Sequence, residues 1–383
     1  MRHWIRAVLP LVVRLNVASQ KEALPIERYR EIRAVDISPD AITQISIRRC
    51  LPDARASSDT DRVLSILFNA RFRRGPRSLV EAHRETFLRI IARTIDRFAP
   101  IELILPALPF KCQNPLSTRH SIGFTDLGEW LMFCQLRDLI MSIRQAYEPG
   151  ARMIVLSDGI VYADIFAAGL RDIPAITRYR ESCRAITNTL GLSDAVTLVD
   201  MSDVVRRFAD FGATRLAIRD ALTDLDRSDP AVSERLCALR RGMLLNVPLP
   251  GYDLDDVARF ASGKLMDLPH DVAERVTSAA FDYASFLLTM QRLEVIAKSF
   301  PTAIRTTSHP KPAAQFPLHL VNARSGVAPH NGIPIISQNA LHGCGGDIRH
   351  AARIMRIVDA LALPGLTAGY IPRDSEPFCY FVE

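Results

Sequence analysis

Apolar residues in the middle of the chain fall into short continuous runs that alternate with helical patterns. The runs at 101–108 (IELILPAL), 152–156 (RMIVL) and 195–200 (AVTLVD) are apolar almost throughout, as in strands buried on both faces of a parallel sheet. Residues 126–147 and the stretch after 159 show mostly helical spacing. This alternation predicts βαβ crossovers and therefore an α/β fold with a Rossmann-like parallel sheet core.

The remaining patterns add helices and a second group of strands. Asp126 followed by Glu129 resembles a capping box at the start of the 126–147 helix, and Pro149-Gly150 supplies its stop. Helical regions are expected at 60–71, 76–97 and, most extensively, 203–298. Strands are expected at 303–309 and 317–323, and a last helix near Asp347. The sequence thus predicts a large helical region followed by a C-terminal strand-containing segment.

The length of 383 residues allows one large domain or two smaller ones. The stretch RCLPDARASSDTD at 49–61 is the best candidate boundary. We expect an atypical N-terminal arm at 1–60, a catalytic domain at 61–336, and a C-terminal extension at 337–383 that packs on the same domain.

Composition indicates a globular protein without a nucleic-acid partner. The chain is 48% hydrophobic and 23% charged, and its net charge of +6 is spread along the sequence without an RGG, RNP or basic-arm signature. The first twenty residues superficially resemble a signal peptide, but the apolar run is short and contains Pro10, so a packed N-terminal element is the preferred interpretation. No stretch approaches the roughly 18 apolar residues of a membrane span, and no membrane partner is expected.

The cysteines favour reduced thiols in a cytoplasmic protein. Seven are present, an odd number, and no pair has CxxC or zinc-ligand spacing. The stretch HGCGGDIRH at 342–350 could be imagined as a metal site, but a glycine-rich helix start capped by Asp347 explains it better. No P-loop and no GxGxxG follows a strand. Neither a metal nor a cofactor is therefore expected.

Polar side chains cluster where the predicted strands end. Lys111 and Asn114 lie on a proline-bounded loop after the first strand, and Asp158 lies in the Ser-Asp-Gly turn after the second. Arg305 and His309 alternate onto one face of a later strand. Because parallel strands end at one edge of a sheet, these segments should face a common crevice. Each feature also has a simpler structural interpretation. Lys111 is then a solvated side chain, the Ser-Asp-Gly segment is an ordinary turn, and Arg305 and His309 lie on a solvated strand face.

The ordered set of motifs resembles the pyoverdine/dityrosine biosynthesis family. The segments are LPALPFKCQNP, FTDLGEWLMFCQLRDLIMSIRQAYEPGARMIVLSDGIVYADI and FPTAIRTTSHPKP. They are similar to the family's Phe-Lys-x-x-Asn-Pro loop, Asp-Leu-Gly-Glu helix start, Ser-Asp-Gly turn and Arg-x-Ser-x-His-Pro strand, in the same order. The resemblance runs from about residue 62 to about residue 316.

The resemblance implies an isonitrile synthase of secondary metabolism. The best-known members convert the α-amine of an amino acid, commonly tyrosine or tryptophan, to an isonitrile. They take the added carbon from ribulose 5-phosphate and need no redox cofactor. A downstream tailoring enzyme is a candidate protein partner.

The family motifs also mark candidate site residues in this chain. The expected catalytic residues are Lys111, Asp158 and His309, and the expected substrate-binding residues are Asn114, Ser157, Arg305, Lys311 and His330. Charged groups of this kind suit a phosphate, an amino-acid carboxylate and the proton transfers of imine formation.

Two departures from the family pattern leave other outcomes open. The stretch APHNGIP at 328–334 stands where members often have Pro-Trp-His-Gly, with His330 one place early and Asn331 in the histidine's place. The later strand reads RTTSHP. An N-formyl amino acid, another amine and sugar phosphate, or a non-catalytic binding protein therefore remain as alternatives, and the amino acid cannot be read from the sequence.

Overall fold

The computed structural model describes most of the chain. The described residues are 1–12, 33–36, 47–108, 124–166, 173–244, 247–252, 256–257, 259–260, 263–308, 314–321, 328–329, 332–337, 352–355, 363, 365, 367–370 and 379–382. Five of the predicted site residues lie outside these ranges, namely Lys111, Asn114, His309, Lys311 and His330.

A five-stranded parallel sheet forms the centre of the structure. Its strands are β2 (Ile101–Pro106), β3 (Ala151–Ser157), β4 (Val196–Asp200), β5 (Ile304–Thr307) and β6 (Phe316–Pro317), in the order β4-β3-β2-β5-β6. Every neighbouring pair is parallel. The predicted α/β class and parallel core are confirmed. Of the strand expected at 317–323, the described residues pair at Phe316–Pro317 and, through an isolated bridge to Arg73, at Leu318, while residues 322–323 lie outside the described ranges.

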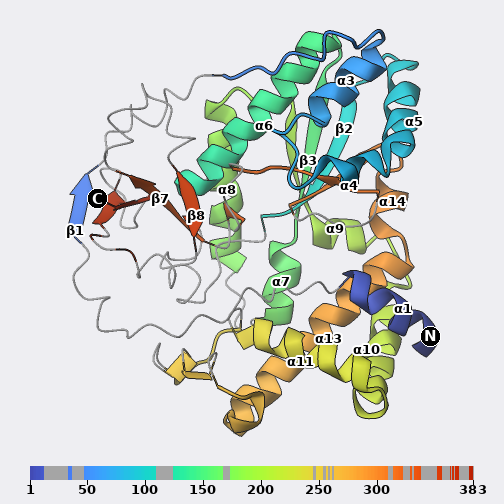
Figure 1. Cartoon of the computed structure of the whole chain (residues 1–383). Helices are drawn as coiled ribbons and strands as arrows, with labels where there is room; N and C mark the ends of the chain where they lie inside the picture. The colour runs from blue at the N-terminus through green and yellow to red at the C-terminus, as the bar shows by residue number, and fades with distance from the viewer. Residues whose placement is uncertain are drawn as a thin grey trace.

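Helices cover both faces of this sheet (Figure 1). On one face, α3 (Asp59–Leu67), α5 (Arg84–Ile95), α6 (Leu127–Ala146) and α8 (Ile173–Thr189) bury an apolar cluster that includes Leu103 and Val155. On the other, α7 (Gly159–Phe166), α9 (Met201–Val205), α13 (His270–Arg292) and α14 (Val295–Ser299) pack on Ile104 and Leu156. The strands need continuous apolar runs because helices pack on both faces of the sheet.

A separate helical layer lies beside the sheet and contains its own apolar cluster (Figure 1). It is built from α1 (Arg2–Val12), α10 (Phe211–Ser228), α11 (Pro230–Leu244) and the N-terminal part of α13. Ile5 and Leu9 of α1 are almost fully buried in it. Arg2 and Arg6 form ion pairs with Asp224 and Asp229, at 2.6 and 2.5 Å. The large helical region predicted at 203–298 is thus present as several helices.

The C-terminal segment contributes to a second, mixed sheet. Its strands are β1 (Arg33–Asp36), β7 (Ile333–Ser337), β8 (Arg353–Met355), β9 (Thr367–Tyr370) and β10 (Cys379–Val382), in the order β1-β9-β10-β7-β8. The helix start expected near Asp347 lies outside the described residues, and residues 353–355 beyond it are a strand. The division at 60 and 336 stays a prediction, although strands from all three expected parts pair in this sheet.

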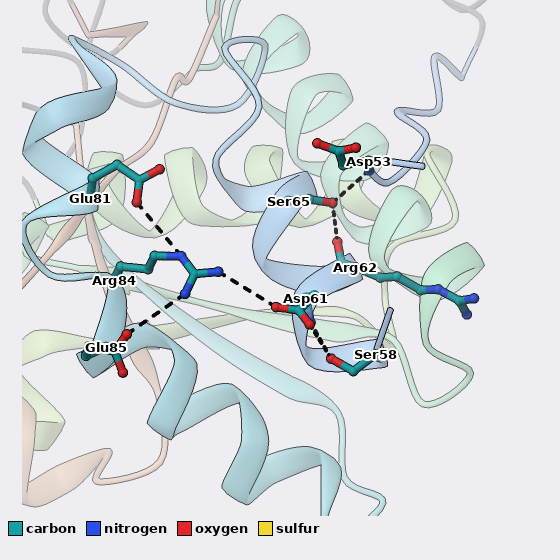
Figure 2. A network of polar contacts seen from close by, with 8 residues as sticks. All are labelled: Asp53, Ser58, Asp61, Arg62, Ser65, Glu81, Arg84 and Glu85. Carbon is teal, nitrogen blue, oxygen red and sulfur yellow. Dashed lines mark hydrogen bonds and ion pairs between the residues drawn. The ribbon is translucent and has the colours of Figure 1, made fainter. Parts of the chain in front are cut away.

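Surface ion pairs connect the short helices at the start of the main body. Arg84 of α5 lies 3.7 Å from Asp61 of α3, and 3.9 Å from both Glu81, at the end of α4 (Arg77–Glu81), and Glu85 (Figure 2). Ser58 caps α3 by accepting the Asp61 backbone N–H. Because these charges are exposed, each pair contributes only about 0–1 kcal/mol to stability.

Gly332 is a position where the second sheet has no room for a side chain. A Cβ there would lie 2.5 Å from the carbonyl oxygen of Met355, which belongs to the paired strand β8. We predict that Gly332→Ala lowers the free energy of unfolding by about 1–3 kcal/mol. Urea denaturation followed by circular dichroism measures this change.

Gly212→Ala is the matched control for that variant. No heavy atom lies within 4 Å of a Cβ at this glycine, which is in the first turn of α10. Alanine should be neutral or slightly stabilising there. Equal unfolding midpoints for both variants would contradict the steric argument.

Candidate active site

The carboxyl ends of the central strands meet at one edge of the parallel sheet. Ser157, the last residue of β3, is in register with Asp200, the last residue of β4. Strand β2 runs in the same direction and ends at Pro106, two residues before Leu108. The strand polarity expected from the sequence is therefore correct, and whether Lys111 and Asn114 take part stays a prediction.

Ser157 contacts the segment that follows β2. Its side chain is 2% exposed, and its hydroxyl donates a hydrogen bond of 2.9 Å to the carbonyl oxygen of Leu108. This bond ties the end of β3 to the segment that follows β2. The structure thus gives Ser157 a positioning contact, and its predicted role in substrate binding is not tested by it.

Asp158 is a buried carboxyl group at this edge. It follows β3 directly, precedes α7 and is 7% exposed. Its carboxyl group is hydrogen-bonded to the hydroxyl of Tyr162, one turn along α7. Its Oδ1 atom has no hydrogen-bond partner in the described part of the chain. A buried polar atom left in this way requires an explanation, and a bound ligand is a direct one.

Burial brings the pKa of Asp158 close to neutrality. Desolvation of the carboxylate is the largest cause and raises its pKa from 3.8 to about 7. The Tyr162 hydroxyl opposes this change, and the charge of Asp200 adds to it. A carboxyl group with such a pKa can accept and donate protons near pH 7.

Asp200, unlike Asp158, has its partners within the protein. Its Oδ2 accepts a hydrogen bond of 3.0 Å from Arg180 of α8. Its Oδ1 accepts the backbone N–H of Ser202 at 2.8 Å and so caps α9. Asp200 therefore acts as a structural group that adds negative charge beside Asp158.

Arg305 is a half-buried cation on the face of the sheet that α7, α9, α13 and α14 cover. It is in register with Ile104, whose side chain belongs to the cluster on that face. Desolvation lowers the pKa of Arg305, and its Nε has no hydrogen-bond partner among the described residues. A desolvated guanidinium of this kind can bind a phosphate or a carboxylate.

Arg305 and Asp158 are arranged to contact different parts of a ligand. Two strand spacings of about 5 Å each and about 13 Å along the strand direction separate their backbones. No ion pair joins them. Arg74 reaches the same region, because its guanidinium donates a 2.5 Å hydrogen bond to the carbonyl oxygen of Ser308, next to β5.

The helix start that follows the predicted loop is held by a buried capping box. The Asp126 carboxylate accepts the Gly128 N–H at 2.7 Å, and Glu129 accepts the Asp126 N–H at 2.9 Å. Glu129 is fully buried and also accepts a 3.0 Å hydrogen bond from the hydroxyl of Tyr179 on α8. The capping box expected from the sequence is confirmed, and its contacts are structural.

Sequence reasoning missed Tyr162 and Tyr283. The spacing of four residues between Asp158 and Tyr162 on a predicted helix was a usable signal. Tyr283 lies on α13, 121 positions after Tyr162, and no local pattern indicates it. The hydroxyl groups of the two tyrosines are hydrogen-bonded to each other.

A hollow of about 340 Å³ between α7 and α13 does not include these residues. It is lined by Asp164, Ile165, Asp271, Glu274, Arg275, Ser278, Ala279 and Asp282. Asp282 is already paired with Arg215 and Arg219. We therefore place the candidate active site at the carboxyl edge of the parallel sheet, where Asp158 has its raised pKa.

Metal ligands and membrane spans are not evident in the part of the chain that the structure describes. No group of three or more His, Cys, Asp or Glu side chains there could hold a metal ion. Cys50, Cys134, Cys183, Cys237 and Cys379 are free thiols. None of the described helices combines the length and the apolar character needed to cross a membrane.

The fold is that of an α/β protein, and the candidate site lies at the carboxyl ends of its parallel strands, where open α/β sheets bind ligands. Residues 91–244 match the family model described as pyoverdine/dityrosine biosynthesis protein. Together with the curated relatives below, this match supports the resemblance of the chain to the pyoverdine/dityrosine biosynthesis family.

Curated relatives of the chain are named isonitrile synthases. The L-tyrosine isonitrile synthase of Pseudomonas aeruginosa is 28% identical over 255 residues, which cover 65% of this chain and 74% of the relative. That of Xenorhabdus nematophila is 25% identical over 250 residues, which cover 62% and 69%. The L-tryptophan isonitrile synthase AmbI2 of Fischerella ambigua is 29% identical over 143 residues, which cover 34% and 41%.

A solved structure shares the fold. The crystal structure of PvcA from Pseudomonas aeruginosa superimposes with a TM-score of 0.63 at 22% sequence identity, over 85% of this chain and 100% of that one. This likeness supports the architecture described above, including the parallel sheet.

Titration of the buried Asp158 carboxyl group makes the free energy of unfolding depend on pH. Its pKa is higher in the folded chain than in the unfolded chain, so the folded state binds the proton more tightly. The associated stability is fully present below about pH 4 and is lost as the pH rises to about 7. We predict that the free energy of unfolding of Asp158→Asn, relative to that of the parent, rises by on the order of 4 kcal/mol between pH 4 and pH 8.

Denaturation at a series of pH values measures that difference. Comparing the two proteins at each pH cancels the other titrating groups. A constant difference across this range would show that Asp158 titrates normally.

The buried capping box provides a second prediction. Glu129→Ala leaves the Tyr179 hydroxyl and the Asp126 N–H without their acceptor. We predict a loss of about 2–4 kcal/mol in the free energy of unfolding. Glu85→Ala is the control, because Glu85 is 85% exposed and should change stability by less than about 0.5 kcal/mol. Equal stabilities of the two variants in urea would be the contrary result.

Proposed function

We propose that the protein is an isonitrile synthase that converts the α-amine of an amino acid to an isonitrile, with ribulose 5-phosphate as the carbon donor. The observation that most supports this is the buried Asp158, whose Oδ1 lacks a partner at the carboxyl edge of the sheet. The names of the curated relatives support the reaction class. The sugar phosphate and the independence from a redox cofactor come from the family resemblance.

The first chemical step needs a proton carrier of the kind that Asp158 offers. The amine nitrogen attacks the keto carbon, a carbon–nitrogen bond forms, and the carbonyl oxygen takes the electron pair. A proton moves from nitrogen to this oxygen and gives the neutral carbinolamine. Loss of water then gives the imine, with a second proton delivered to the departing hydroxyl group and a second removed from nitrogen. A carboxyl group whose pKa is about 7 can perform both transfers at neutral pH.

Two cations are required because the substrates bring a phosphate and a carboxylate. Arg305 is the proposed phosphate anchor, since its guanidinium is desolvated and can form bidentate bonds to oxyanions. Lys111 is proposed beside the reacting carbon, where it would stabilise developing negative charge. His309 would move protons, and Asn114, Lys311 and His330 would contact substrate.

Product analysis tests the reaction directly. Purified protein is incubated with isotopically labelled ribulose 5-phosphate and a panel of amino acids, and the products are analysed by mass spectrometry. An isonitrile that contains the label supports the proposal. An N-formyl product, which is heavier by one water, would identify the alternative outcome, and no product with any amino acid would favour a binding protein.

Arg305 and Lys111 should affect the kinetics differently. We predict that Arg305→Ala raises the KM for ribulose 5-phosphate, through loss of a charge-assisted contact of about 1.5–3 kcal/mol, and changes kcat less. Lys111→Ala should lower kcat. Steady-state kinetics with ribulose 5-phosphate as the varied substrate separate the two effects.

Two further variants control this experiment. Arg305→Lys keeps the charge but not the bidentate geometry, so it should recover only part of the affinity. Arg353→Ala removes an exposed arginine from β8 and should leave both constants unchanged. Unchanged kinetics in folded Arg305→Ala and Lys111→Ala would remove both residues from the site.

A further inference from the structure

Two tyrosines extend a hydrogen-bonded chain from Asp158 into the helical layer. Tyr162 is four residues after Asp158, and the first turn of α7 places it next to the carboxyl group, with its N–H bonded to the Asp158 carbonyl at 2.9 Å. Tyr283 reaches Tyr162 from α13. Their ring centroids are 5.6 Å apart at an interplanar angle of 49°.

The number of available protons sets the direction of this chain. The Tyr162 hydroxyl has one proton and donates it to the ionised Asp158 carboxylate. Its oxygen can then accept the proton of Tyr283, to which it is hydrogen-bonded. One carboxylate oxygen is thereby held by the protein, whereas Oδ1 has no partner among the described residues.

We propose that Tyr162 and Tyr283 are positioning residues that hold one oxygen of Asp158 and leave Oδ1 directed at the substrate. This inference rests on the proposed function, in which Asp158 moves protons during imine formation. The hydroxyl pair performs no chemistry itself. It fixes the orientation of the carboxyl group and sets the pH range in which Oδ1 is a base.

Among the groups around Asp158, Tyr162 is the main one that opposes the effect of burial on its pKa. Asp200 faces it from the end of β4 and makes ionisation harder, although Arg180 of α8 binds Asp200. The hydrogen bond from Tyr162 favours the ionised form. Tyr283 acts one step further away, by polarising the Tyr162 hydroxyl.

Infrared titration of the Asp158 carboxyl group tests the proposal without an activity assay. The carbonyl band is assigned by its loss in Asp158→Asn, and its midpoint is followed with pH. Tyr162→Phe should raise the midpoint by about one pH unit, a tenfold change in the dissociation constant. Tyr283→Phe should raise it by less, and it keeps the Tyr162 hydroxyl if Tyr162→Phe fails to fold.

Tyr147→Phe is the matched control. Tyr147 donates a 3.0 Å hydrogen bond to the carbonyl oxygen of Ala99, next to the start of β2 and thus at the opposite edge of the sheet. Its removal should leave the Asp158 midpoint unchanged. A folded Tyr162→Phe or Tyr283→Phe with the parent midpoint would overturn the proposal.

Kinetics then separate this proposal from the proposed function. In an active enzyme, the acid limb of kcat/KM should move to higher pH in Tyr162→Phe by the same amount as the infrared midpoint. If the Asp158 midpoint shifts in the variants but the protein forms no isonitrile, the proposed function is refuted and the positioning role of Tyr162 and Tyr283 is supported. If the protein forms an isonitrile but the midpoints do not shift, the proposed function is supported and the positioning role is refuted.

Discussion

The parallel ladder between β2 and β3 is the constraint on which the rest of the structure depends. It pairs residues from Ile101 with Ala151 to Pro106 with Leu156, so both strands run in one direction. Parallel neighbours cannot be joined by a hairpin, and α6 must therefore cross one face of the sheet. Both faces then need apolar cover. The same polarity brings Leu108, Ser157 and Asp200 to one edge, where the proposed site lies.

Burial acts in opposite directions on the pKa values of two charged groups, Asp158 at the edge of the sheet and Arg305 within β5. It raises the pKa of Asp158 and lowers that of Arg305, so in both cases the neutral form is favoured. The two groups do not compensate each other, because they lie on different strands with β2 between them. A ligand with an amine at one end and an oxyanion at the other would supply both missing partners. The raised pKa of Asp158 and the lowered pKa of Arg305 are therefore consistent with the two substrates of the proposed reaction.

The sequence predicted the features that depend on local patterns. The central strands are continuous apolar runs, and α6 has its capping box within four residues, so both could be recognised without the structure. The second sheet could not, because β8 has three residues and β1 pairs with β9 across most of the chain, from Arg33 to Thr367. Within the described part of the strand expected at 317–323, pairing ends at Leu318, since composition does not show which residues find a partner. Tyr283 meets Tyr162 only through tertiary packing.

The contrast between Glu129 and Asp158 shows how the chain separates structure from function. Both carboxyl groups are buried, but Glu129 receives a donor at each oxygen, whereas Asp158 keeps Oδ1 without one. The other side-chain atoms in the described residues that are buried without partners are the Nε atoms of Arg137, Arg180, Arg240 and Arg305. Arg180 and Arg240 bind carboxylates through their other nitrogens, so each loses one donor of five. A carboxyl group has only two oxygens and loses half of its acceptors. Such a loss at a buried position is destabilising unless a ligand completes it, which is the physical reason for proposing Asp158 as a site residue.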